Sequence, residues 1–336
     1  MKKLFLSIVT TLLLFSPSFA ANVEMLPTMQ SKTNVQDRVW VGTFQIVWND
    51  FMDRIVHSII KFPDGTPVMV NELNKQDFTV DELSDKSYYR YVGKVQKNTK
   101  KIITKAIKKK FNEKSDILDQ LDMTPASNKY LVYAMLKKDF EYAKALNKLK
   151  PEAFKGSEGD IEYFGILKSS KTSARDIVNV LFYNDMNDFA VSLKTKQNDV
   201  VYLYRTNDNK TFSEYYSDMN KKANVSKTNR EFTKNDELKI PNLDFKTETL
   251  FGELCNKAIK NSDLVIAKAI ETVEFKMDNV GVKLKSEAGI EMMRVSLEPP
   301  QKSRYFYLTG QYVIFLQDKN KRYFALKVAD AKALQK

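Results

Sequence analysis

PPQKSRYFYLTGQYVIFLQDKNKRYFALKV (299–328) carries the clearest pattern in this chain: three short apolar runs with polar turn residues between them. Each run is rich in aromatic and β-branched residues, which favour β-strands. Lys319 and Asn320 divide the last two runs and predict a turn between two antiparallel strands. We therefore expect the chain to end in an antiparallel sheet.

The central part of the sequence continues this pattern toward the N-terminus. Four segments alternate or run apolar, and Asn-Asp pairs between them indicate turns. A long strand is expected over 237–248, with Pro241 at an edge or a bulge, and helices are expected over 210–223 and 249–260. The four segments are IEYFGIL (161–167), DIVNVLFYN (176–184), DFAVSLKTK (188–196) and DVVYLYR (199–205).

The first third of the chain has a helical texture instead. Apolar residues recur at three- and four-residue spacing over 38–56, and a short helix is expected over 78–85. The clearest expected helix runs from Tyr88 to Phe111, and a strand is expected over 128–137. A helix-rich first third followed by mostly antiparallel sheets predicts an α+β fold.

The N-terminus has the composition of an export signal. Lys2 and Lys3 precede an apolar run over 4–15, and small residues before Ala21 predict cleavage there. We expect residues 1–20 to be a signal peptide, 21–37 a flexible lead-in and 38–336 a single domain. The protein would then be exported by a bacterial cell to the periplasm or secreted. The later sequence has no apolar run long enough to predict a membrane span.

Few residues suited to catalysis are present. His57 is the only histidine and Cys255 the only cysteine, so an intramolecular disulfide is impossible. A zinc site or a Cys–His pair would need both residues, and they lie in segments with no sequence link. We expect no enzyme, cofactor or metal site. A hydrolase with two carboxylates from distant strands stays an open alternative.

The net charge of +12 points to anionic partners. Eight lysines and no acidic residue lie between 94 and 110. A row of ammonium groups along a helix could bind a cell-wall glycan, lipopolysaccharide or a glycosaminoglycan, and the alternative is an ordinary solvated face. The candidates for polyanion binding, in a protein expected to be a monomer, are Lys94, Lys97, Lys101, Lys105 and Lys108.

Three segments together resemble the serpin family. LKIPNLDFKTETLFGEL (238–254) resembles the strand-then-helix segment of serpins, and VEFKMDNVGVKLKSEAG (273–289) resembles the strand that leads into their reactive loop. The closing stretch 299–328 resembles their last two strands. The resemblance implies a serpin-like domain and a reactive loop. Its candidate residues are Glu287, Ala288, Gly289, Met293 and Arg294.

The length of this loop shapes the functional expectation. In inhibitory serpins, the resemblance implies, the cleaved loop inserts into a sheet as a new strand. A strand of about 15 residues, roughly 50 Å, would be needed, whereas only residues 288–298 lie between Glu287 and Pro299. We therefore expect a non-inhibitory binding protein. The alternative is an inhibitor that presents 288–298 reversibly, like a substrate, to an extracytoplasmic protease.

Overall fold

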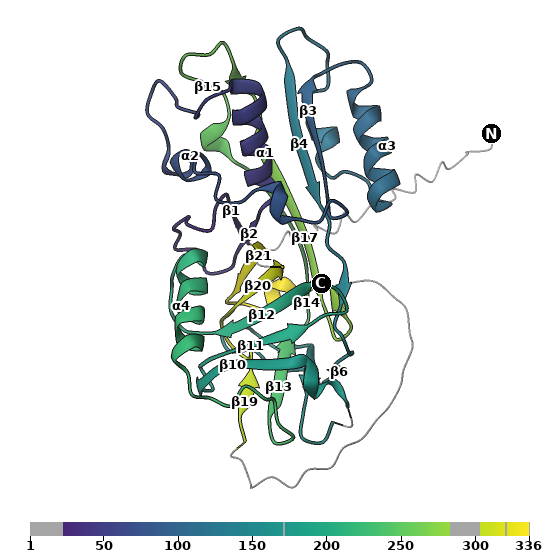
Figure 1. Ribbon diagram of the computed structural model, residues 1–336, viewed down its shortest axis with the longest axis vertical. Helices are drawn as coiled ribbons and strands as arrows, with labels where there is room; N and C mark the ends of the chain where they lie inside the picture. Colours follow the sequence, from purple (N-terminus) through teal and green to yellow (C-terminus); the bar gives the residue numbers. More distant parts are fainter. Residues whose placement is uncertain (1–22, 171, 283–302, 320, 336) are drawn as a thin grey trace, which may run out of the picture.

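The computed structural model describes residues 23–170, 172–282, 303–319 and 321–335 (Figure 1). A seven-stranded sheet has the order β1-β2-β21-β20-β12-β11-β10. Its strand pairs are antiparallel except for the parallel pair β1–β2. The strands are β1 Glu24–Leu26, β2 Arg38–Val41, β10 Val178–Asp185, β11 Asp188–Lys194, β12 Asp199–Arg205, β20 Tyr312–Asp318 and β21 Lys321–Val328.

A four-stranded sheet, in the order β19-β13-β9-β6, packs against one face of the larger sheet. The ring of Phe306 on β19 lies 5.2 Å from that of Phe189 on β11 and 4.9 Å from that of Tyr183 on β10. Such edge-to-face pairs stabilise a core by about 0.5–1.5 kcal/mol each beyond their burial. The strands are β6 Asn147–Lys148, β9 Tyr163–Ile166, β13 Glu237–Pro241 and β19 Tyr305–Tyr307.

Five two-stranded ladders complete the described sheets. Two of them are long: β3 Tyr88–Lys94 pairs with β4 Tyr130–Leu136, and β14 Leu243–Leu250 pairs with β17 Ile270–Met277. The short pairs are β5 Phe140–Glu141 with β18 Gly281–Val282, β7 Glu152–Ala153 with β8 Asp160–Ile161, and β15 Lys257–Ala258 with β16 Val265–Ile266.

The α-helices cover the sheets from the outside. Helix α4 lies alongside the seven-stranded sheet in Figure 1, and its Phe212 and Tyr216 rings pack on Phe315 of β20. A capping box between Thr211 and Glu214 starts this helix. The α-helices are α1 Thr43–Phe51, α2 Val68–Leu73, α3 Thr99–Phe111 and α4 Phe212–Val225. A short π-helix follows α1 at Met52–Val56, and 3₁₀ turns lie at Val80–Glu82, Leu118–Gln120, Ala174–Ile177, Gly252–Leu254 and Lys332–Leu334.

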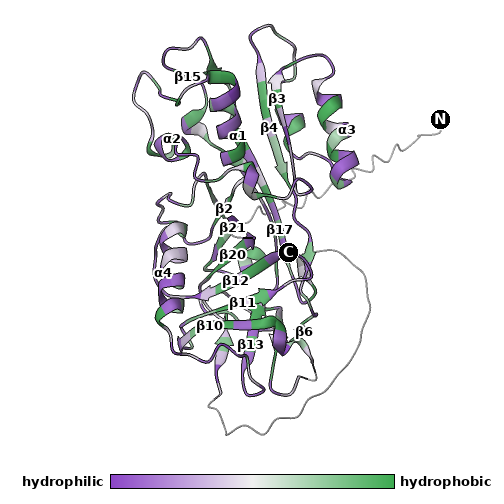
Figure 2. Cartoon of the chain, in the orientation of Figure 1, coloured by the Kyte–Doolittle hydropathy of each residue, from purple (hydrophilic) through white to green (hydrophobic). Residues whose placement is uncertain are grey.

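The molecule has two hydrophobic cores. The main one lies between the sheets, whose strands are mostly hydrophobic in Figure 2. The smaller one lies between α3 and the β3–β4 hairpin, which therefore form a packed unit of their own beside the main body (Figure 1). Its buried residues are Val95, Ile103, Ile107, Leu118, Leu131 and Tyr133.

The helix expected from Tyr88 to Phe111 is wrong in its first half. Residues 88–94 form strand β3, and α3 begins only at Thr99. The aromatic and β-branched residues of 88–94 pair across the hairpin, Tyr91 opposite Tyr133 and Val92 opposite Val132. These cross-strand contacts, which lie 40 residues away in the chain, override the local helical spacing.

The flexible lead-in expected over 21–37 is also wrong for the described residues. Residues 24–26 form β1, an edge strand of the seven-stranded sheet, and Met25 and Leu26 are buried. The Thr247 side chain donates a hydrogen bond to the Val23 carbonyl at 3.3 Å. The short apolar run in this segment thus has a place in the core.

Two expected helices are shorter than predicted. The segment 38–56 opens with β2 and turns into α1 at Gly42, where a Cβ atom would lie 2.1 Å from the Phe78 ring. His57 follows the helical segment as its C-cap, with a φ of 56°. The segment 249–260 forms a single 3₁₀ turn and then β15.

The long strand expected over 237–248 is two strands in different sheets. Pro241 ends β13, and the chain bends at Asn242 before β14 begins at Leu243. Proline has no amide hydrogen to continue a ladder, which agrees with its place at the strand end. The remaining strand expectations, over 128–137 and from 161 to 205, are confirmed.

Candidate functional site

The predicted lysine row lies on two elements instead of one helix. Lys94 ends β3, and its ammonium group stands over the Tyr130 ring of β4 at 5.7 Å. Lys97 precedes α3, whereas Lys101, Lys105 and Lys108 lie on α3 itself. The lysines still form a continuous row in the folded protein, because β3 leads directly into the turn before α3.

The outer surface of α3 is strongly basic. Ile103 and Ile107 are fully buried against the hairpin, so the lysines on the opposite side of α3 face solvent. Figure 2 shows the last turn of α3 as hydrophilic. We call the following exposed residues, which make no ion pair or hydrogen bond with the described part of the chain, the basic face: Lys97, Lys101, Lys105, Lys108 and Lys109.

The placement of these charges along α3 is only partly explained by helix stability. Lys108 and Lys109 lie in the last turn, where cations are favoured by the helix dipole. Lys100 and Lys101 lie in the first turn, where cations are disfavoured, and that turn has no acidic residue. Lys100 is offset by an ion pair with Asp119 at 2.5 Å, whereas Lys101 has no such partner.

The reactive-loop candidates Glu287, Ala288, Gly289, Met293 and Arg294 lie outside the described residues. The chain is held firmly just before this segment. Strand β18 pairs with β5, and Gly281 packs so closely on it that a Cβ atom would lie 2.5 Å from Glu141 Cα. The φ of +151° at Gly281 also requires glycine.

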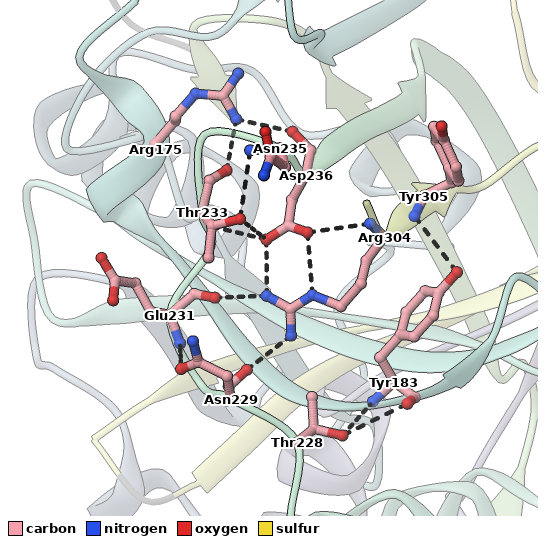
Figure 3. A network of polar contacts seen from close by, with 10 residues as sticks. All are labelled: Arg175, Tyr183, Thr228, Asn229, Glu231, Thr233, Asn235, Asp236, Arg304 and Tyr305. Atoms are coloured by element: carbon pink, nitrogen blue, oxygen red, sulfur yellow. Dashed lines mark hydrogen bonds and ion pairs between the residues drawn. The ribbon is translucent and has the colours of Figure 1, made fainter. Parts of the chain in front are cut away.

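A buried ion pair holds the chain just after this segment (Figure 3). Arg304 donates from Nε and Nη2 to the two oxygens of Asp236, at 3.0 and 2.7 Å, and Asp236 is fully buried. Two further donors of Arg304 bind the Asn229 carbonyl at 2.8 Å and the Glu231 carbonyl at 2.6 Å. Four of the five guanidinium N–H donors are therefore used, and the pairing with Asp236 is bidentate, which is the geometry of a strong anchor.

Arg175 extends this anchor to the neighbouring turn. Its Nη1 donates to the carbonyls of Thr233 and Asp236, at 2.9 and 2.8 Å (Figure 3). The Thr233 amide in turn donates to Asp236 at 2.7 Å. This network is not predictable from the sequence, because Asp236 and Arg304 are 68 positions apart and carry no local motif.

A large cleft separates the β3–β4 hairpin from the β14–β17 hairpin. It has a volume of about 2540 Å³ and is lined by β4, β17, the residues of α1 and the segment 111–122. Helix α1 contacts β4, while its Phe44 amide faces Glu271 of β17. The helix therefore forms the floor between the two hairpins.

The strands beside this cleft are short. Strand β4 has seven residues and β17 has eight, and within the described ranges each pairs along one side only, β4 with β3 and β17 with β14. Both strands are shorter than the roughly 15 residues expected of an inserting strand, and the required length stays a prediction. The eleven residues 288–298 exceed the length of either strand, so loop length alone does not exclude insertion.

The end of β4 is fixed to the main sheet. The Lys138 ammonium group lies 3.0 Å from Asp199 and 2.5 Å from Asp318, and 4.9 Å from the centre of the Tyr323 ring. Both carboxylates are buried, and Tyr323 donates to Asp199 at 2.8 Å. The hairpin is thus anchored at this end of the cleft.

The described residues offer little for metal or membrane chemistry. No group of three His, Cys, Asp or Glu side chains within the described ranges is placed to hold a metal ion. In the same ranges, no helix has the length and apolar character to cross a bilayer.

Comparison with known proteins identifies the architecture. No family model matches the sequence, and no curated protein matches it. The structure is similar to Serpin48, a highly specific serpin of the insect Tenebrio molitor, with a TM-score of 0.52 and 10% identity, over 90% of this chain and 94% of that one. The chain has a serpin-like fold.

Two human proteins of this fold are also similar, at lower scores. Thyroxine-binding globulin in complex with thyroxine has a TM-score of 0.46 and 8% identity, over 85% of this chain and 95% of that one. Glycosylated kallistatin has a TM-score of 0.45 and 11% identity, over 86% and 96%. The similarity to Serpin48 confirms the expected serpin-like fold and its α+β class, and at 10% identity the similarity concerns the fold alone.

Proposed function

We propose that this protein is an exported, non-inhibitory binding protein with a serpin-like fold, which attaches to an anionic polymer through the basic face and has no catalytic activity. The observation that carries the proposal is the group of five exposed, unpaired lysines on and next to α3. Residues 1–20 would direct it to the periplasm or the medium, where it would act as a monomer. Cell-wall glycans, lipopolysaccharide and glycosaminoglycans are the polymers that such a surface would meet.

The physical basis of this binding is release of counterions. Each ammonium group that neutralises a sulfate or phosphate frees a counterion, so affinity falls steeply with salt. The basic face spans about three turns of helix at about 1.5 Å per residue, which suits a linear polymer better than a compact ligand. Some other lysines of the described chain are engaged in ion pairs, as at Lys138.

The test is elution from heparin agarose with a salt gradient. Reversing Lys97, Lys101 and Lys105 to Glu should lower the eluting salt concentration strongly. A matched control reverses Lys75, Lys221 and Lys234, which are exposed residues on separate elements, and should elute close to the wild type. Equal shifts in both triple variants would show that only net charge matters and would refute the basic face.

A protease inhibitor remains the second candidate, because the cleft strands are shorter than 288–298. Insertion of a nicked loop would add a strand between β4 and β17 and should raise the melting temperature strongly. Limited proteolysis followed by thermal melting and incubation with trypsin- and elastase-like enzymes separates the two candidates. A nicked protein with an unchanged melting temperature and no inhibition would eliminate the inhibitor.

A further inference from the structure

The floor of the cleft carries a row of aromatic side chains from α1. Phe44, Trp48 and Phe51 follow one another at three- and four-residue spacing, so they share one face of the helix. The Phe44 and Trp48 ring centres are 6.4 Å apart, and those of Trp48 and Phe51 are 6.2 Å apart. All three side chains line the cleft.

Glu271 of β17 lines the same floor without a partner. Its residue is 4% exposed, and neither carboxyl oxygen has a hydrogen-bond partner among the described residues. The Phe44 amide faces it from the first turn of α1 and lowers its pKa, but burial outweighs this effect and raises the pKa to about 8. A buried carboxyl group without a partner costs free energy, which a ligand could recover.

Several charged side chains on the surrounding elements are already engaged. Asp50 of α1 pairs with Arg90 of β3 at 2.9 Å, and Lys246 of β14 pairs with Asp116 at 2.7 Å. Lys268 donates to the Gln120 carbonyl at 3.1 Å. Glu271 is therefore the described cleft residue that combines complete burial of its carboxyl oxygens with the lack of any counter-ion.

We propose that the cleft floor binds an organic cation, an ammonium or guanidinium group on an apolar body, with Glu271 as its ion-pair partner and the aromatic row of α1 as its apolar wall. Aromatic faces attract cations most strongly when water is excluded, and a carboxylate adds direct charge pairing. An anionic or a neutral ligand would gain no charge pairing with Glu271, because only a cation favours the ionised form of the carboxyl group. The site differs from the basic face in charge and location.

Binding should be accompanied by proton release. Glu271 is mostly protonated in the empty cleft at pH 7, because its pKa is about 8. A bound ammonium group favours the ionised form, so the carboxyl proton passes to solvent as the ion pair forms. Close to one proton should be released for each cation bound.

The test uses isothermal titration calorimetry with three ligands of equal chain length: octylamine, 1-octanol and octanoate. At pH 7 we expect octylamine to bind at least about tenfold more tightly than 1-octanol, and octanoate more weakly than both. Titration of the wild-type protein in two buffers of different ionisation enthalpy measures the proton release directly. This second measurement needs no variant.

Glu271→Gln should reduce the affinity for octylamine to that for 1-octanol and abolish proton release. Glu253→Gln is the control, because Glu253 is exposed in the 3₁₀ turn Gly252–Leu254, does not line the cleft and should leave both quantities unchanged. Equal affinities for octylamine and 1-octanol, absence of proton release, or binding of an extended peptide in place of the amine would each overturn the proposal. Heparin elution of Glu271→Gln should match the wild type, so failure here leaves the basic face untouched.

Discussion

Helices α3 and α4 have similar lengths but differ in how far their charged side chains are paired. In α4 two of the charged side chains are paired within the molecule: Asp218 lies 3.0 Å from Lys210, and Lys222 lies 2.9 Å from Asp188. In α3 the lysines of the basic face have no such partner among the described residues. The comparison indicates that α4 serves the stability of the sheet that it covers, whereas α3 retains unpaired charges that are available to a partner.

The largest effect on stability is expected at Glu271, whose carboxyl group is buried and has no ion-pair partner among the described residues. Its pKa in the folded protein, about 8, lies above the ordinary value of 4.5, so the folded state holds the proton more tightly. The resulting stability is complete below about pH 4.5 and is lost as the pH rises through 8. Between pH 5 and 8 the wild type should lose about 2–4 kcal/mol of unfolding free energy more than Glu271→Gln.

Urea unfolding at the two pH values measures this difference. Asp37 and Asp50 also have a raised pKa through burial, so the wild type alone would not isolate Glu271. Subtracting the pH dependence of the unfolding free energy of Glu271→Gln from that of the wild type removes the contribution of Asp37 and Asp50. Identical pH dependence in both proteins would mean that the carboxyl group finds a partner in solution.

An intermediate effect is expected from removing the charge pairing of α4. Asp218→Ala removes an ion-pair partner of Lys210 and Lys222. It also removes the acceptor of the Tyr204 hydroxyl, which donates to Asp218 at 2.6 Å. The unfolding free energy should fall by about 1–3 kcal/mol, because the buried hydroxyl and the two cations lose an acceptor. Lys105→Ala on α3 is the counterpart and should change it by less than about 0.5 kcal/mol. A similar loss in both variants would erase the contrast between the helices.

The smallest effect is expected from Lys101→Glu, which should raise the stability of the protein but weaken its binding to heparin. Lys101→Glu places an acid in the first turn of α3, where the helix dipole favours it, and should stabilise the protein by about 0.3–1 kcal/mol. The same substitution should weaken retention on heparin. Lys108→Glu, at the other end of α3, should weaken retention but lower the melting temperature. If neither variant eluted from heparin at a lower salt concentration than the wild type, the lysines of α3 would be ordinary solvated surface charges.

Strand identity was predictable wherever the pattern was long and regular. The segments that became β10, β11 and β12 alternate over seven or eight residues, and neighbouring strands follow in sequence, so local pattern and tertiary pairing agree. The first half of 88–111 was mistaken for a helix because Val92 and Val95 also fit a helical spacing. Only the pairing of β3 with β4 removes this ambiguity.

The candidate sites were predictable to different degrees. The lysines from 97 to 108 were found because a run of one charge within one helix is a local pattern. Glu271 and the Arg304–Asp236 anchor were missed because nothing near either residue distinguishes it from other charged residues. Their environments depend on α1, β17, β13 and β19, which meet only in the folded chain.

The order of residues alone was enough to establish the α+β class, the serpin resemblance of 238–328 and the basic row, since each depends on neighbours in the chain. Tertiary structure was needed to show that β1 joins the main sheet, that 237–250 divides between two sheets and that two hairpins leave a cleft between them. The physical reason is that burial and strand pairing join residues far apart in sequence, and these contacts determine which charges are paired. Glu271 and the basic face are unpaired for that reason, one inside the cleft and the other on the surface.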